Sequence, residues 1–198
     1  MEYFDKALAI DPNFKFALNG KGWALNHQGK YAQAIPLFDK ALDIDPNYTA
    51  PLSNKGMALF SLGNNTGAIK YFDQALAIQP NDVFALGGKG KALEHLGNYT
   101  EAIKYFDQAL AIQPNDVFAL GGKGYTLRFL GNYTEAIKYF DQALAIQPND
   151  VNALMGKQNA LSNVTTPSNA AAPVGCHFYY HHHHRYFLSA CRAVLFSR

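Results

Sequence analysis

The chain has 198 residues, of which 17 are basic, 15 are acidic and only two are cysteines. In residues 1–164 there are 14 basic and 15 acidic side chains, so this part has a net charge of −1 and lacks the electropositive surface typical of proteins that bind nucleic acid or anionic membranes. Both cysteines, Cys176 and Cys191, lie near the C-terminus, which excludes a disulfide framework for the preceding residues.

A period of 34 residues organises the chain up to about residue 163. Rows of identical residue types stand at this spacing, which only a repeated structural unit explains. The rows include Gly29, Gly63, Gly97 and Gly131; Pro12, Pro46, Pro80, Pro114 and Pro148; and Phe4, Phe38, Phe72, Phe106 and Phe140.

Each unit is predicted to form two helices. In the unit 15–48, Leu18 and Leu25 fall on one face of the first helix, and Phe38 and Ala41 fall on one face of the second. A glycine separates the two helices and a proline ends the second one. Helix starts are predicted from capping residues, which are Asn98 and Asn132, each with a Glu three residues later, and Asp82, Asp116 and Asp150.

The sequence resembles the tetratricopeptide repeat. A small residue in the first helix, Gly-x-Tyr at the turn, and then Ala, Phe, Ala and Pro carry the resemblance. The glycines are Gly22, Gly56, Gly90 and Gly124, and the Gly-x-Tyr motifs are Gly29 to Tyr31, Gly97 to Tyr99 and Gly131 to Tyr133. Asn65, Gln158, and Lys21, Lys55, Lys89, Lys123 and Lys157 depart from the family pattern.

The resemblance implies an all-α fold, a right-handed α-solenoid of antiparallel helix pairs that forms a superhelix over residues 1–163. We expect a half repeat at 1–14, full repeats at 15–48, 49–82, 83–116 and 117–150, and a partial repeat at 151–163. The remaining residues, 164–198, are expected to be a linker and an irregular tail that contains histidines. Both terminal helices are expected to expose apolar faces.

A peptide-binding groove is expected on the face of the first helices that does not pack within the hairpin. On a helical wheel, this face lies opposite Leu18, Gly22 and Leu25. In the tetratricopeptide repeat family the corresponding face lines the concave groove and takes an extended or helical peptide. The expected groove residues are Phe16, Asn19, Trp23, Asn26 and His27; Met57 and Phe60; Phe84, Lys91, Glu94 and His95; and Phe118, Tyr125, Arg128 and Phe129.

The two most similar repeats support this assignment. Repeats 83–116 and 117–150 differ at four positions, three of which lie in the groove rows. Clustering of this kind is expected where the ligand surface varies over a constant scaffold. The differing pairs are Lys91 and Tyr125, Ala92 and Thr126, Glu94 and Arg128, and His95 and Phe129.

No catalytic, cofactor or metal site is predicted. The run GGKG at Gly87 to Gly90 lacks the Ser or Thr and the preceding strand of a phosphate-binding loop, so its glycines are expected to permit close helix packing. The histidines His27 and His95 are about two repeats apart and have no Cys or carboxylate cluster. The repeated lysines are expected to cover apolar surface with their stems and to place their ammonium groups in water.

These observations predict a non-enzymatic protein-interaction scaffold that binds a peptide or protein of unknown identity. The N-terminus lacks a signal-peptide pattern and no segment is long enough to span a membrane, so a cytoplasmic location without nucleic-acid or membrane partners is expected. One alternative is a helical-repeat nucleic-acid-binding protein. Another is a structural fragment that self-associates through its uncapped ends.

Overall fold

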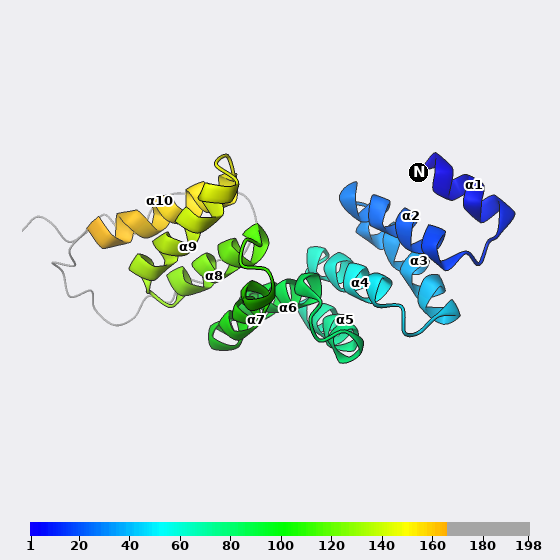
Figure 1. The fold of residues 1–198 in the computed structure, drawn as a ribbon, viewed down its shortest axis with the longest axis horizontal. Helices are drawn as coiled ribbons and strands as arrows, with labels where there is room; N and C mark the ends of the chain where they lie inside the picture. Colours follow the sequence, from blue (N-terminus) through cyan, green and yellow to red (C-terminus); the bar gives the residue numbers. More distant parts are fainter. Residues whose placement is uncertain (166–198) are drawn as a thin grey trace, which may run out of the picture. The chain divides into compact units, whose positions relative to one another are not determined.

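The structure, a computed structural model, describes residues 1–165 as helices joined by short turns (Figure 1). The expected histidine-containing tail, residues 166–198, lies outside the described residues. The helices are α1 (Glu2–Ile10), α2 (Lys15–His27), α3 (Tyr31–Ile44), α4 (Thr49–Ser61), α5 (Asn65–Ile78), α6 (Val83–His95), α7 (Tyr99–Ile112), α8 (Val117–Phe129), α9 (Tyr133–Ile146) and α10 (Val151–Thr165). No strand occurs among them, and the predicted all-α solenoid of helix pairs is confirmed.

A glycine closes the turn inside each hairpin. Gly29, Gly63, Gly97 and Gly131 have φ between 74° and 83°. This left-handed backbone conformation strains a residue with a Cβ atom and is accessible to glycine at little cost. The four glycines at the 34-residue spacing therefore end the first helix of each repeat at the same place.

Buried phenylalanines on second helices pack on glycines of the first helix in the next repeat. Phe72 and Phe106 are fully buried on second helices. A Cβ added to Gly88 would lie 2.4 Å from the Phe72 ring, and one added to Gly122 would lie 2.5 Å from the Phe106 ring. The expectation that these glycines permit close helix packing is therefore confirmed, because a side chain at either position would displace the ring.

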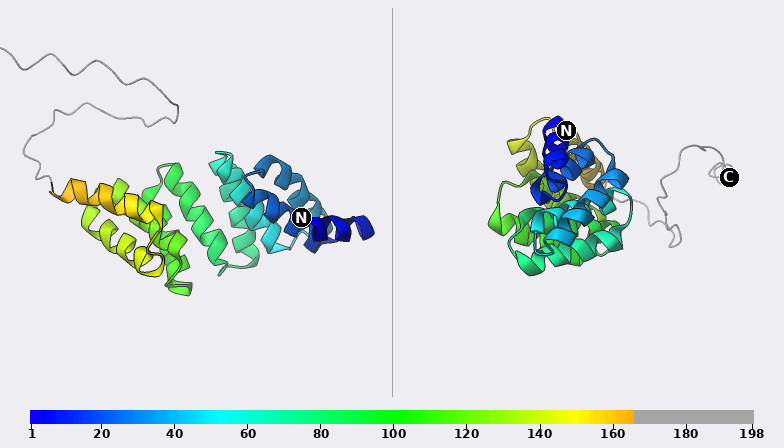
Figure 2. Two further views of the ribbon diagram at one scale, coloured as in Figure 1. Left: turned by 90° about the horizontal axis from the view of Figure 1, so that it is seen from above. Right: turned by 90° about the vertical axis from the view of Figure 1, so that its right-hand side faces the viewer.

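The first helices lie on the inner side of the array. The first helices of the repeats are α2, α4, α6, α8 and α10, and each contacts the next one in this series. Within the described residues, no two second helices contact each other. Since the first helices are closer together, the surface that they line is the concave one. Figure 2 shows the helices following one another in chain order along the array.

The helix starts predicted from capping residues are confirmed, and four of the five capping side chains accept a hydrogen bond from the first turn of their helix. The Asp82 carboxylate accepts hydrogen bonds from the backbone N–H groups of Phe84 and Ala85. The carboxylates of Asp116 and Asp150 each accept one from the backbone N–H group three residues later. The Asn132 side chain accepts from the Glu135 N–H at 3.4 Å. Helix α7 begins directly after Asn98 as predicted, but Asn98 makes no side-chain capping bond, although the same residues follow both asparagines.

Three of the repeated lysines, Lys55, Lys89 and Lys123, place their ammonium groups on Asp and Tyr side chains, which corrects the expectation that these groups lie in water. Lys89 lies on α6, and its Nζ is 2.5 Å from Asp73 Oδ1 and 2.6 Å from the Tyr105 hydroxyl oxygen. Asp73 belongs to the preceding second helix and Tyr105 to the following one, so the lysine joins three helices. The same contacts with Asp and Tyr are made by Lys55 and Lys123.

Candidate functional site

Aromatic side chains are exposed along the concave face. Phe16 and Trp23 on α2 are 54% and 50% exposed, and Phe84, Phe118 and Phe129 on α6 and α8 have similar exposure. Large aromatic residues are usually buried, and a row of half-exposed rings marks a surface suited to binding a partner. The structure therefore places these predicted site residues at an accessible surface.

Three of the predicted residues surround one hollow. Met57, Phe84 and Phe118 come from three successive first helices and line a cavity of about 460 Å³. Its remaining wall comes from the turns that precede α6 and α8 and from the first residue of α6, and it consists of Gln79, Asn81, Asp82, Val83, Gln113 and Asp116. The helical wheel missed these residues because they lie at or before helix starts, although they recur at the 34-residue spacing.

At the N-terminal end of the groove, the predicted residues contact one another and their neighbours. The Phe16 ring packs against that of Tyr48, with 5.5 Å between centroids, and the Trp23 ring against that of His27 at 4.1 Å. Farther along, the rings of Phe60 and His95 pack edge to face with centroids 4.8 Å apart, which joins groove residues of two repeats.

Two predicted asparagines take part in packing between repeats. Asn54, on α4, donates a hydrogen bond from its side chain to Asn19 Oδ1 at 3.0 Å, and its carbonyl oxygen accepts one from Asn26 at 3.0 Å. The Oδ1 atom of Asn26 is buried and has no hydrogen-bond partner among the described residues. Asn19 and Asn26 therefore stabilise the junction of α2 and α4.

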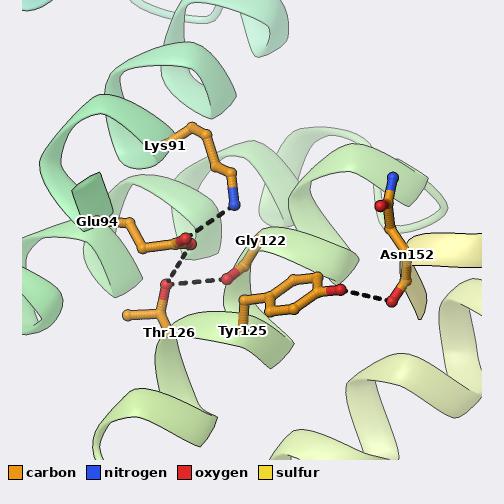
Figure 3. A network of polar contacts seen from close by, with 6 residues as sticks. All are labelled: Lys91, Glu94, Gly122, Tyr125, Thr126 and Asn152. Atoms are coloured by element: carbon orange, nitrogen blue, oxygen red, sulfur yellow. Dashed lines mark hydrogen bonds and ion pairs between the residues drawn. The ribbon is translucent and has the colours of Figure 1, made fainter. Parts of the chain in front are cut away.

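A second polar network crosses the junction of α6 and α8 (Figure 3). Glu94 is only 6% exposed, and its carboxylate lies 2.8 Å from Lys91 Nζ and 3.1 Å from the Thr126 hydroxyl. That hydroxyl also lies 2.9 Å from the Gly122 carbonyl oxygen, so its single proton can be donated to either acceptor. The buried carboxylate thus has a cation and a hydroxyl as partners, as a charge in this position requires.

Tyr125 is anchored at the same junction. Its hydroxyl donates to the Asn152 carbonyl oxygen at 2.6 Å, as Figure 3 shows, and its ring packs edge to face on Phe140 at 5.1 Å. Burial raises the pKa of the Tyr125 hydroxyl above its ordinary value, and this effect outweighs the opposing attraction of Arg128. The hydroxyl is therefore a neutral donor at physiological pH.

The four positions that distinguish repeats 83–116 and 117–150 are physically coupled. Lys91 and Glu94 of one repeat contact Tyr125 and Thr126 of the next, with Lys91 Nζ 5.2 Å from the Tyr125 ring centroid. Arg128 lies over the Phe129 ring at 4.5 Å. Coupling between neighbouring repeats is thus a second physical reason for the clustering of these differences, besides variation at a ligand surface.

The described residues contain no group of three or more His, Cys, Asp or Glu side chains that could hold a metal ion. None of the helices in residues 1–165 is long and apolar enough to cross a membrane.

Comparison with solved structures shows the same architecture in other proteins. YrrB, described as "a TPR protein with an unusual peptide-binding site", is 27% identical, with 79% of this chain and 81% of YrrB covered and a TM-score of 0.62. MamA is 25% identical, with 73% and 85% covered and a TM-score of 0.63. A thermophilic TPR protein of Thermus thermophilus is 19% identical, with 80% of this chain and 87% of that protein covered and a TM-score of 0.70. At this identity the similarity concerns the fold alone.

No curated protein sequence matches the chain. The tetratricopeptide repeat family, in contrast, matches residues 16–48, 53–117 and 117–150. These matches cover most of the helices from α2 to α9. The chain belongs to the tetratricopeptide repeat family.

Proposed function

We propose that this chain is a non-enzymatic scaffold that binds a peptide or protein segment in the groove lined by its first helices. The observation that carries the proposal is the hollow at Met57, Phe84 and Phe118, which opens on a face with half-exposed aromatic rings. Tetratricopeptide repeats suggest a protein-interaction role, and YrrB is described as having a peptide-binding site.

The energetics of binding favour this face. Aromatic side chains contribute a large share of interface energy because they bury much apolar surface and lose little conformational entropy. The rings of Phe84 and Phe118 are attached to helices whose opposite faces are buried, so the groove is preorganised. A preorganised surface spends less free energy on ordering itself when it binds.

Site-specific cross-linking tests the proposal. Either Phe118 in the hollow or Gln108, exposed on the second helix α7, is replaced by p-benzoylphenylalanine, and the whole chain is irradiated in extract from its source cells. We expect covalent protein adducts from position 118 and none from position 108. Equal adducts from both positions, or adducts from position 108 alone, would exclude the groove as the binding surface.

Alanine variants separate binding from folding. Phe84→Ala and Phe118→Ala remove rings that are nearly half exposed, so little stability should be lost, while affinity for the cross-linked partner should fall roughly thirtyfold for each ring that contributes about 2 kcal/mol. Phe106→Ala is the matched core variant, and it should cost about 3–5 kcal/mol of folding free energy because its ring is fully buried. Circular dichroism at increasing urea concentration distinguishes the two classes.

A further inference from the structure

The charge around the hollow at Met57, Phe84 and Phe118 is of one sign. The charged residues that line the hollow are Asp82 and Asp116, and among the described residues no Lys, Arg or His lines it. The rest of the lining is apolar or consists of amide side chains. A cation with an apolar neighbour is the ligand group that complements such a surface.

The two aspartates differ in the number of carboxylate oxygens that already accept a hydrogen bond. Asp82 caps α6 through Oδ1, and its Oδ2 accepts a hydrogen bond from the Ser53 hydroxyl at 2.9 Å. Asp116 caps α8 through Oδ1, at 2.7 Å from the Ala119 nitrogen. Gly87 stands one repeat after Ser53 and has no side chain to donate, so among the described residues no side chain hydrogen-bonds the second oxygen of Asp116.

The same glycine shapes the apolar part of the hollow. A Cβ on Gly87 would lie 3.0 Å from Cδ1 of Phe118, so the absence of a side chain lets this ring lie against α6. The Phe118 ring and the Asp116 carboxylate both line the hollow. A cation bound in the hollow would gain from a carboxylate and from contact with an aromatic ring.

The size of the hollow fits side chains of a peptide. A cavity of about 460 Å³ lies in the range of sites that enclose small ligands, and it is larger than one side chain needs. It therefore has room for a basic side chain at Asp116 and for an apolar neighbour at Met57 and Phe84.

We infer that the hollow binds a peptide segment in which a Lys or Arg stands next to an aliphatic or aromatic residue, with the cation at Asp116 and the apolar side chain against Met57, Phe84 and Phe118. This inference rests on the proposed function of the groove. It specifies a basic ligand, in contrast to an acidic peptide, which the two carboxylates would repel.

Selection from a random peptide library on the immobilised whole chain tests the inference. We expect the enriched peptides to contain Lys or Arg adjacent to an apolar residue, relative to peptides selected on the Phe84→Ala, Phe118→Ala double variant. Enrichment of acidic or uncharged peptides would overturn the inference and leave the proposed function standing. No enrichment over the double variant would mean that the groove binds no peptide, and both would fall.

Charge-neutral variants place the cation. Asp116→Asn retains an oxygen to cap α8 and removes the charge, whereas Asp150→Asn makes the same change at the start of α10, outside the hollow. Affinity for the most enriched peptide, measured by fluorescence anisotropy, should fall about two- to fivefold in Asp116→Asn and stay unchanged in Asp150→Asn. An equal fall in both variants, or in neither, would contradict the assignment of the cation to Asp116.

Discussion

At the scale of single residues, the close approach of helices depends on glycines that face buried rings. Phe106 is enclosed by α6 and α8, where Cβ atoms on Gly90 and Gly122 would come within 2.9 Å and 2.5 Å of its ring. Glycine inside a helix costs about 0.5–1 kcal/mol relative to alanine. That cost is offset here by the burial of the Phe106 ring, which a side chain at either position would displace.

Two adjacent glycines of α8 should respond to alanine in opposite ways. Gly121→Ala should stabilise the chain by about 0.5–1 kcal/mol, since no atom lies within 4 Å of the new Cβ and the gain in helix propensity is retained. Gly122→Ala should be destabilising, because displacing the Phe106 ring costs about 1–3 kcal/mol and exceeds that gain. Urea unfolding of the two variants measures the sign of each change in the free energy of unfolding. A stabilised Gly122→Ala variant would show that the ring moves aside at no cost.

At the scale of helices, the repeated lysines connect neighbouring hairpins electrostatically. Burial, the largest single influence, lowers the pKa of the Lys89 ammonium, but the hydrogen bonds and attraction from Asp73 and Tyr105 together outweigh it and raise the pKa above its ordinary value of 10.5. The same balance raises the pKa of Lys55 and Lys123. The protonated lysines therefore stabilise the folded chain.

The raised pKa values predict how stability depends on alkaline pH. The contribution of these lysines is fully present below the pKa of an unfolded lysine, about 10.4, and is lost as the pH rises through the higher folded value. The urea midpoint of the chain should therefore fall above pH 10.5. In a Lys55→Met, Lys89→Met, Lys123→Met variant the fall should be shallower. Equal slopes in the two proteins would mean that the ion pairs add nothing.

Much of the helical architecture was predictable because it depends on contacts within one repeat. Glycines in turns, Asp caps and the Phe rows act over a few residues or within one hairpin, and the 34-residue spacing displays them repeatedly. The absence of a side-chain capping bond at Asn98 has a local cause. Asn132, in the same local sequence, makes a capping bond of 3.4 Å, which is at the limit of hydrogen bonding, so small differences in backbone decide it.

Contacts between repeats were less predictable. A helical wheel shows which face a residue lies on, but the neighbour across the junction depends on how the hairpins stack. Lys89 was therefore expected in water, whereas it is paired with Asp73 of the preceding hairpin. Tyr125 is predicted to be a groove residue, whereas in the structure its hydroxyl and ring also hold α8 to neighbouring helices. Its replacement should affect folding as well as binding.

At the scale of the whole molecule, the charge balance separates the proposed scaffold from a nucleic-acid-binding protein. Residues 1–164 have a net charge of −1, and the lysines that form a regular row are largely paired with aspartates. The chain should therefore bind single-stranded RNA no better than a neutral control protein at physiological salt, as measured by filter binding. A submicromolar affinity that falls steeply with salt would favour nucleic-acid binding.

The two ends of the array should differ in stability. Helix α1 contains no buried residue, and its Tyr3 and Ile10 are 84% and 87% exposed, whereas α10 buries Ala153 and Ala160 at its inner face. Each repeat is stabilised chiefly by its neighbours, so a helix with little buried surface opens at a low free energy. Amide hydrogen exchange should therefore be fastest in α1, intermediate in α10 and slowest in α6 to α8. Because self-association through the ends would also protect them, exchange should be measured at two chain concentrations. Protection of α1 that rises with concentration would show that a second copy covers it, and concentration-independent protection of α1 equal to that of α7 would contradict the expected opening.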